Sequence, residues 1–313
     1  MRILVTGAGG FVGRHLVSHL LECGHEVTAT SLDVPEQASS GPVRWGAMDL
    51  TDAAAVMQFC AECRPEGVIH CAAQASVGGS WDDPVATYRS NIEGTCNLLE
   101  AVKQVRPRTL LVGSAQQYAR REDGRMLTES SPQTAGSPYA LTKIAQEQMG
   151  LMYLAHYGVP VLFTRSFNHT GPGQSPEYAV GSFCSQLARL EGAGGGEMRV
   201  GNLDSRRDFS DVRDVVRAYR LLLEAGVPGE AYNVCSGVAV RMGDVLDKLL
   251  EATGLKDSVQ VHQQTLHVSA ASDVLAGDPA KVRTAVGWAP QIPLDRSLAE
   301  TLDWYRSNLE GKR

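Results

Sequence analysis

Short apolar runs alternate along the first half of the chain with longer segments in which apolar residues recur every three or four positions. Short apolar runs bounded by turn residues are typical of buried strands, and the longer periodic segments are typical of amphipathic helices. Strands that alternate with helices predict an α/β fold with a Rossmann-type, doubly wound parallel sheet. The predicted strands lie at 2–6, 26–30, 43–47, 67–71, 109–113 and 160–165.

The pattern divides the chain into two parts near residue 166. We expect residues 1–166 to form the sheet domain and residues 167–313 to form a smaller C-terminal lobe that binds substrate. Segment 209–237 is expected to return to the sheet domain, because it ends in a strand-like run at 231–234. Beyond the boundary we expect irregular helices, and the glycine-rich segment 192–196 predicts a flexible surface loop.

A glycine turn lies between the first strand and the helix that follows it. Gly7 permits the tight turn, Gly10 lets the backbone approach a phosphate, and Gly13 lets the helix pack close to the strand. The helix N-terminus then offers N–H groups and a partial positive charge to an anion. The turn therefore predicts a dinucleotide site in which these glycines, with Phe11 and Val12, hold the pyrophosphate.

Three polar side chains carry the candidate chemistry. Tyr139 and Lys143 lie four residues apart on a predicted helix that starts after Ser137 as N-cap and ends near Gly158. An ammonium beside a phenol lowers the pKa of that phenol, which makes Tyr139 a candidate proton donor or acceptor. Ser114 ends an apolar strand, where such a sheet delivers side chains to its ligand crevice.

These three features, in this order, resemble the extended short-chain dehydrogenase/reductase family. The resemblance extends to the segments DLTD at 49–52, HCAAQ at 70–74 and NIEGT at 91–95. It implies that Ser114 orients the substrate oxygen, Tyr139 moves the proton, and Lys143 tunes Tyr139 and holds the nicotinamide ribose. It also implies further cofactor contacts from Asp49, Leu50, Ala72, Ala73, Gln74 and Asn91.

The second half resembles the nucleotide-sugar branch of this family, closest to its GDP-mannose dehydratase and GDP-4-keto-6-deoxy-mannose reductase subgroup. The segments that carry this resemblance lie at 165–174, 200–209 and 211–215. By resemblance, Asn168 contacts the substrate diphosphate and Arg207 clamps it, in keeping with the fit of a guanidinium to phosphate oxygens. The alternative for Arg207 is a structural ion pair with Asp208 or Asp211.

The residues after Ser114 favour a reductase. In dehydratases of this family an acid lies one or two positions after the catalytic serine or threonine, whereas here Ala115 and Gln116 stand there. A glutamine cannot exchange a proton at neutral pH, so elimination is disfavoured. We expect Gln116 to contact substrate. We predict reduction of GDP-4-keto-6-deoxy-D-mannose to GDP-D-rhamnose. The alternatives are a nucleotide-sugar 4-epimerase, a 4,6-dehydratase, and a non-catalytic nucleotide sensor, which the presence of both Tyr139 and Lys143 disfavours.

Two positions bear on ligand affinity. Ser31 stands where members that prefer NAD carry an acid, which leaves room for a 2′-phosphate; Asp33 could still reach the ribose. We expect NADP(H) to be preferred and NAD(H) to be possible.

Val268 and Ser269 replace an Arg-Pro pair that nucleotide-sugar members usually carry and whose arginine binds the diphosphate. The loss of that arginine should weaken nucleotide binding by about 1.5–3 kcal/mol, which His267 could partly offset.

Charge, apolar runs and cysteine content limit the possible partners and the cellular location of the protein. A net charge of −6 without a basic block argues against nucleic acid, and no apolar run is long enough for a membrane span. The absence of a leader and the seven cysteines indicate the cytoplasm. The CxxC pair at Cys60 and Cys63 has no second pair, so we expect no metal. By resemblance we expect a homodimer through the helices at 91–104 and 139–156; Met149, Met152, Tyr153 and Leu154 would serve either that interface or the core.

Overall fold

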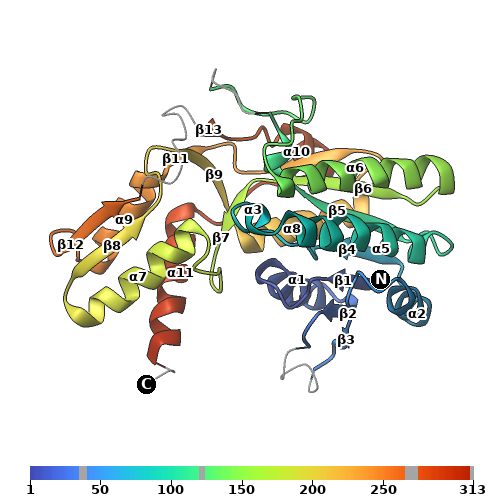
Figure 1. Cartoon of the computed structure of the whole chain (residues 1–313), viewed down its shortest axis with the longest axis horizontal. Coiled ribbons are helices and arrows are strands. Elements are labelled where there is room, and N and C mark those ends of the chain that lie inside the picture. The colour runs from blue at the N-terminus through green and yellow to red at the C-terminus, as the bar shows by residue number, and fades with distance from the viewer. Residues whose placement is uncertain (35–40, 120–123, 265–273, 311–313) are drawn as a thin grey trace.

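The computed structural model describes residues 1–34, 41–119, 124–264 and 274–310. Its centre is a seven-stranded parallel sheet in the order β10-β6-β5-β4-β1-β2-β3 (Figure 1). The doubly wound α/β fold is confirmed, and all six predicted strands are present. The strands are β1 (Arg2–Thr6), β2 (Glu26–Ser31), β3 (Arg44–Ala47), β4 (Gly67–His70), β5 (Arg108–Ser114), β6 (Val161–Ser166) and β10 (Ala231–Val234).

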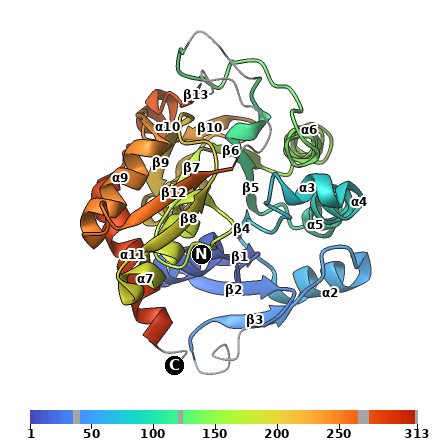
Figure 2. The same cartoon turned by 60° about the vertical axis from the view of Figure 1, so that its left-hand side comes forward.

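Helices cover both faces of the sheet. The helices α2 (Ala53–Cys63), α5 (Gly94–Val102) and α6 (Pro138–Tyr157) lie on one face (Figure 2), together with the short α3 (Gly79–Asp82), α4 (Pro84–Tyr88) and the π-helical turn η2 (Arg89–Glu93). The helices α1 (Phe11–Glu22), α8 (Val212–Ala225) and α10 (Ala280–Val286) lie on the other. Neighbouring residues of β1 alternate between the two cores: Ile3 and Val5 pack with α1 and α8, whereas Leu4 packs with α2 and α5.

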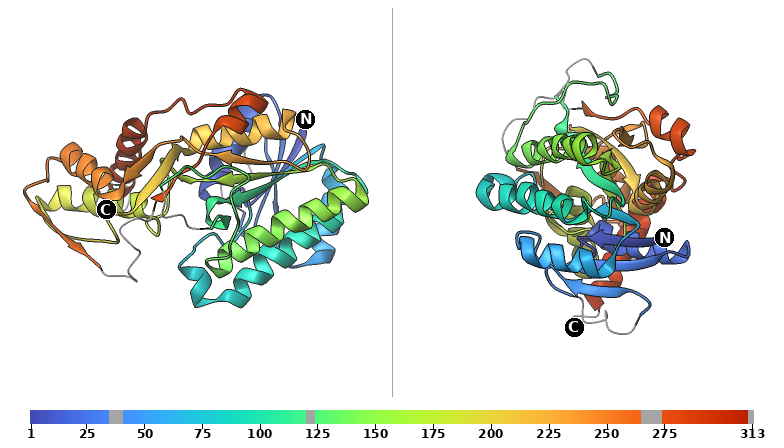
Figure 3. Two further views of the ribbon diagram at one scale, coloured as in Figure 1. Left: turned by 90° about the horizontal axis from the view of Figure 1, so that it is seen from above. Right: turned by 90° about the vertical axis from the view of Figure 1, so that its right-hand side faces the viewer.

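Much of the chain after residue 166 forms a lobe at one end of the molecule (Figure 3). Its helices are regular, so our expectation of irregular helices was wrong: the apolar faces of α7 and α9 pack against α11 around a core that includes Phe183 and Leu246. The lobe elements are β7 (Asn168–Thr170), α7 (Ala179–Ala193), β8 (Gly196–Val200), β9 (Arg206–Asp211), β11 (Ala239–Arg241), α9 (Met242–Thr253), β12 (Val259–Gln263), β13 (Val274–Leu275) and α11 (Leu294–Glu310).

The prediction of a flexible surface loop at 192–196 was also wrong. Residues 192 and 193 complete α7, and Gly194 ends that helix with a φ of 75° in the left-handed region. Gly195 lies so close to the Ser258 carbonyl that a Cβ there would meet this oxygen at 2.4 Å. Gly196 then begins β8, which pairs with β12. The glycines therefore form a tight join between a helix and a strand.

The chain returns to the sheet twice after residue 166. Residues 209–211 belong to β9, which pairs with β7, β11 and β13 in the lobe, and only from Val212 does the chain pack on the sheet. β10 then extends the sheet beside β6. A later segment also returns, because Val282 of α10 and Trp288 join the core beneath α8. We keep the division near residue 166 as a proposal, with the segment of α10 added to the sheet side.

Candidate active site

A cavity of about 1510 Å³ lies at the carboxyl edge of the sheet, between the sheet and the lobe. Single small-molecule sites usually occupy about 300–1,000 Å³, so this cavity has room for two ligands side by side. Of the residues we predicted to bind or react, all but Asn91 line it. Those residues are Gly7, Gly10, Phe11, Val12, Gly13, Ser31, Asp49, Leu50, Ala72, Ala73, Gln74, Ser114, Gln116, Tyr139, Lys143, Asn168 and Arg207.

Asn91 lies behind the wall of the cavity, fully buried in η2. Its side-chain oxygen accepts from the Gln74 amide at 2.7 Å, and its Nδ2 donates to the Gln74 carbonyl at 3.1 Å and to Thr142 Oγ1 at 3.0 Å. Asn91 therefore holds the segment after β4 in place, where Gln74 meets the cavity. The direct cofactor contact that the resemblance implied stays a prediction.

The glycine turn has the shape that a pyrophosphate requires. Gly7 adopts a φ of 69°, and a Cβ on Gly13 would lie 2.2 Å from the Gly7 carbonyl oxygen. Gly10 is the N-cap of α1, and no side chain caps that end of the helix. The turn thus presents backbone to the cavity at a helix N-terminus, which fits a dinucleotide.

The far end of the cavity, beside β2 and β3, fits an adenosine. Ser31 lies at the end of β2, and its hydroxyl donates to the Asp33 carbonyl. The Asp49 carboxylate accepts from the Thr51 amide and hydroxyl at 2.9 and 2.8 Å, and these bonds lower the pKa of Asp49. Leu50 is buried against Gly94 of α5. The hydrogen bonds from Asp49 to Thr51 therefore fix the turn that lines this end of the cavity.

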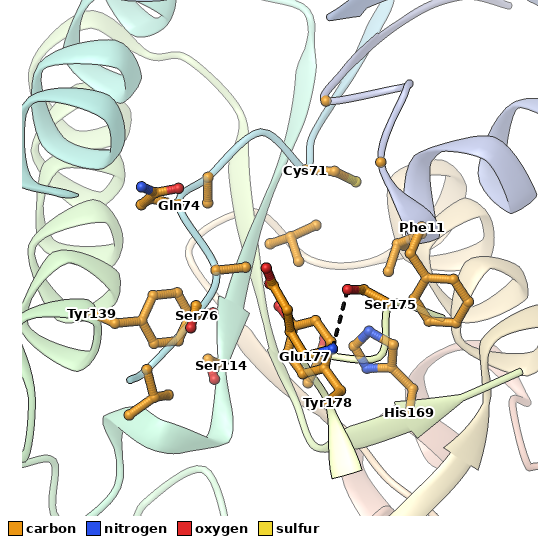
Figure 4. A pocket seen from close by; sticks show the side chains of 18 of the residues that line it. Phe11, Cys71, Gln74, Ser76, Ser114, Tyr139, His169, Ser175, Glu177 and Tyr178 are labelled. Atoms are coloured by element: carbon orange, nitrogen blue, oxygen red, sulfur yellow. Dashed lines mark hydrogen bonds between the residues drawn. The ribbon is translucent and has the colours of Figure 1, made fainter. Parts of the chain in front are cut away.

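Ser114 at the end of β5, and Tyr139 and Lys143 of α6, line another part of the cavity, and Figure 4 shows Ser114 and Tyr139. Ser137 caps α6 as expected, accepting from the Ala140 amide at 3.1 Å, and Gly158 ends the helix in the left-handed region. Burial raises the pKa of Tyr139 to about 12, and the interaction of its phenol with Ser114 opposes this rise. The phenol therefore holds its proton at neutral pH, in the form that can donate to an oxygen.

Our expectation that Lys143 lowers the pKa of Tyr139 is wrong for this structure. The Lys143 ammonium donates to the Val112 carbonyl at 2.8 Å and to Gln146 Oε1 at 3.1 Å. It lies 5.9 Å from the centre of the Tyr139 ring. Burial also lowers the pKa of Lys143, to about 8. The ammonium is therefore tied to the strand below it, and burial dominates the pKa of both groups.

The lobe contributes residues that we did not predict. Ser175, Glu177 and Tyr178 come from the loop before α7, and Figure 4 shows Glu177 pointing into the cavity. His169 stacks on Phe11, with ring centres 6.1 Å apart and ring planes 9° apart. His169 lies within the segment 165–174 that carries the family resemblance. The loop at 175–178 has no such signal in the sequence, beyond an acid and an aromatic residue ahead of a helix.

Arg207 reaches the cavity from β9, near Asn168 of β7, which pairs with the same strand. The two acids that offered a structural alternative have other partners. Asp208 accepts from the backbone of Ser236, Gly237 and Gly277. Asp211 pairs with Arg213 at 2.8 Å. Arg207 itself donates to the Arg206 carbonyl at 2.9 Å, and its contact with the substrate diphosphate stays a prediction.

Three further predictions concern the segment around residue 268, a metal site and a membrane span. His267, Val268 and Ser269 lie outside the described residues. Within the described ranges, no three His, Cys, Asp or Glu side chains gather as metal ligands, and the Cys63 thiol donates to the Cys60 carbonyl. No described helix is both long enough and apolar enough to span a membrane.

Comparison with known proteins agrees with this geometry. The family model described as GDP-mannose 4,6 dehydratase matches residues 4–301. The chain is 32% identical to a GDP-6-deoxy-D-mannose reductase of Pseudomonas aeruginosa, covering 97% of both chains. It is 30% identical to a UDP-glucose 4-epimerase of Mycolicibacterium smegmatis, covering 98% of this chain and 99% of the other.

Solved structures give the same result. RMD from Pseudomonas aeruginosa, complexed with NADPH, superposes with a TM-score of 0.84 at 30% identity, covering 98% of this chain and 99% of that one. A UDP-glucose 4-epimerase of Thermus thermophilus, in complex with NAD, superposes with a TM-score of 0.87 at 30% identity over the same shares. The resemblance found in the sequence is confirmed, and the chain belongs to the GDP-mannose 4,6 dehydratase family of extended short-chain dehydrogenase/reductase enzymes.

Proposed function

We propose that the protein reduces the C4 ketone of GDP-4-keto-6-deoxy-D-mannose to give GDP-D-rhamnose. The observation that carries the proposal is the turn after Ser114, where Ala115 and Gln116 leave no acid for the elimination of a hydroxyl. The likeness to a GDP-6-deoxy-D-mannose reductase over nearly the whole chain supports it. So does the phenol of Tyr139, which burial keeps protonated at neutral pH.

In this proposal each residue has a defined task. The bound reduced nicotinamide supplies a hydride to C4. The Tyr139 hydroxyl donates its proton to the ketone oxygen, and the Ser114 hydroxyl hydrogen-bonds that oxygen and orients it. Lys143 holds positive charge beneath the reacting groups and contacts the nicotinamide ribose. Gln116 contacts the sugar, while Asn168 and Arg207 hold the diphosphate at the lobe end.

The proposal is tested by supplying GDP-4-keto-6-deoxy-D-mannose and following the oxidation of NADPH and NADH in separate reactions. We expect stoichiometric oxidation and one GDP-6-deoxyhexose product. Absence of oxidation by intact protein that binds dinucleotide would overturn the proposal.

Glu177 is the observation that favours a second candidate, a 4,6-dehydratase. Its carboxylate enters the cavity from the lobe, whereas the acid of family dehydratases follows the serine or threonine on the sheet side. A dehydratase would convert GDP-mannose to the 4-keto-6-deoxy sugar without added reductant. A 4-epimerase would also need no reductant, but its product would keep the C6 hydroxyl. Incubation with GDP-mannose alone therefore separates these two activities from the reductase.

We further propose that NADP(H) is preferred, with NAD(H) accepted. The small Ser31 side chain at the adenosine end of the cavity supports this. Ser31→Asp should raise KM for NADPH at least about tenfold, since the new carboxylate repels a 2′-phosphate, and should lower KM for NADH, since it can bind the ribose diol. Steady-state kinetics with both cofactors measure the ratio. An unchanged ratio would show that position 31 does not determine the preference.

We propose a homodimer through α5 and α6. Met149 and Tyr153 of α6 pack on this chain's own core, but Met152 is 62% exposed, and Leu141 of the same helix is exposed as well. Met152→Glu should therefore yield a monomer by light scattering, because a charge would be buried in an apolar interface. Met57→Glu on α2, which replaces another exposed methionine, is the control. A dimer that survives Met152→Glu would place the interface elsewhere.

We also propose a cytoplasmic location. All seven cysteines lie in described segments and all are free thiols, which supports a reducing compartment.

A further inference from the structure

A buried glutamine connects the Ser114 turn to a charged pair inside the protein. Gln117 is fully buried two residues beyond Ala115, in the short 3₁₀ turn η3 (Ala115–Gln117) that follows β5. Its Oε1 accepts from the Ser114 amide at 2.8 Å, while the Ser114 hydroxyl accepts from the Gln116 amide at 3.2 Å. Both the amide and the hydroxyl of Ser114 are therefore held by residues of this turn.

The other end of the Gln117 side chain is fixed by a carboxylate. Its Nε2 donates to Glu147 Oε2 at 3.0 Å, in α6. Because a carboxylate only accepts, the NH₂ group of Gln117 must face Glu147 and its oxygen must face the Ser114 amide. The hydrogen bond to Glu147 thus decides which way the amide points.

Glu147 is in turn fixed in place by an arginine. Arg165 donates to it twice, from Nε to Oε2 at 3.0 Å and from Nη2 to Oε1 at 2.6 Å. Both side chains of this pair are more than nine-tenths buried. Gln133 also donates to Glu147 Oε1 from its side chain, at 3.2 Å, while its backbone pairs with that of Tyr118, the residue that follows the turn. A two-point ion pair of this kind leaves the carboxylate little freedom to rotate.

The backbone around Gln117 is shaped to admit its amide. A Cβ on Gly113, the residue before Ser114, would lie 2.5 Å from Gln117 Oε1 and 2.3 Å from the Thr164 carbonyl. The side chain therefore lies directly beneath the end of β5. The Gln117 amide is thus in direct contact with the strand end that carries Ser114.

We infer that Gln117, oriented by Glu147, is a positioning residue that sets the placement of the Ser114 hydroxyl relative to Tyr139. It touches neither substrate nor cofactor and acts through the serine. The inference rests on the proposed function, because it gives Ser114 the task of orienting the ketone oxygen. A hydroxyl misplaced by about 1 Å costs about 10²-fold in rate in well-studied enzymes.

The test compares two substitutions of glutamine around the same carboxylate. Gln117→Met keeps the length of the side chain and removes its polar ends, whereas Gln133→Met removes the bond to the other carboxylate oxygen. We expect Gln117→Met to lower kcat about 10- to 100-fold with little change in KM, and Gln133→Met to stay within about twofold of the parent. Equal losses in the two variants would overturn the inference, since both would then report general damage to the ion pair.

A double-mutant cycle with Ser114→Ala shows whether Gln117 acts through the serine. Ser114→Ala alone should lower kcat about 10²- to 10³-fold. Adding Gln117→Met to Ser114→Ala should change kcat by less than about twofold further. Losses that multiply would overturn the inference, whereas a full kcat in Ser114→Ala would overturn the proposed function instead.

A third measurement needs no substrate. Hydrogen exchange at the Ser114 amide should be faster in Gln117→Met than in Gln133→Met, because only the first variant removes its acceptor. Equal exchange in the two variants would overturn the inference whatever reaction the enzyme catalyses.

Discussion

Replacing Tyr139 by phenylalanine is expected to lower kcat by about 10³-fold or more while leaving dinucleotide affinity within about twofold. The ring of Tyr139 is 8% exposed and keeps its packing in the variant, so the loss falls on the hydroxyl alone. That hydroxyl is the donor that burial keeps protonated, with a pKa raised to about 12. Steady-state kinetics with the keto sugar and titration of the variant with NADPH measure the two quantities separately.

Tyr178→Phe is the matched comparison, because Tyr178 presents the other phenol labelled in the cavity (Figure 4). Burial raises the pKa of Tyr178 as well, so both phenols are protonated at neutral pH. The loss in Tyr178→Phe should be at least tenfold smaller than in Tyr139→Phe if Tyr139 is the donor. The reverse order would assign the proton to Tyr178 and would remove the role we give to α6.

The local patterns at the sheet edge were sufficient to predict which segments of the sheet domain line the cavity. The turn from Gly7 to Gly13, the cap at Ser137 and the strand end at Ser114 each depend on contacts within a few residues, and all are present in the structure. Parallel strands place their carboxyl ends along one edge, so a correct strand order brings these segments together. The structure therefore agrees with the sequence wherever local geometry and topology decide the outcome.

The predictions failed where a contact distant in sequence decides the outcome. Lys143 was expected to act on Tyr139 four residues away, but its ammonium bonds to Val112 on the neighbouring strand. The sequence also carried no sign that the Asn91 side chain bonds the backbone of Gln74, seventeen residues away. Periodicity reports which face of a helix is buried, and it does not report which carbonyl lies opposite a given side chain.

The lobe was harder to predict for a related reason. The glycine-rich stretch at 192–196 has the composition of a loop, yet Gly194 serves as a helix cap and Gly195 fits against Ser258. Glu177 lines the cavity from the position before Tyr178, the N-cap of α7, and no short-range signal marks that position. Substrate-side residues come from loops that the rigid sheet and lobe bring together, as is usual for ligand sites.

Replacing Gly13 by alanine is expected to abolish turnover by removing the dinucleotide site. The new Cβ would lie 2.2 Å from the Gly7 carbonyl oxygen, 2.6 Å from the Ala8 Cα and 2.8 Å from the Ala8 carbonyl carbon. All three atoms are backbone, so no side chain can move aside. The Gly7 carbonyl also accepts from the Gly10 amide at 3.1 Å, so displacing it breaks the turn. Overpacking of this kind costs about 1–3 kcal/mol, and here the distortion falls on the groups that face the pyrophosphate.

We expect NADPH affinity to fall at least about 100-fold in Gly13→Ala, equivalent to about 2.7 kcal/mol, by isothermal titration calorimetry. Gly136→Ala is the matched control, because a Cβ there meets no atom within 4 Å. It should bind NADPH as the parent does, and thermal unfolding of both variants separates loss of the site from loss of the fold. Gly13→Ala that binds NADPH normally would show that this turn is not needed to hold the pyrophosphate, and the assignment of the glycine turn to the dinucleotide would be wrong.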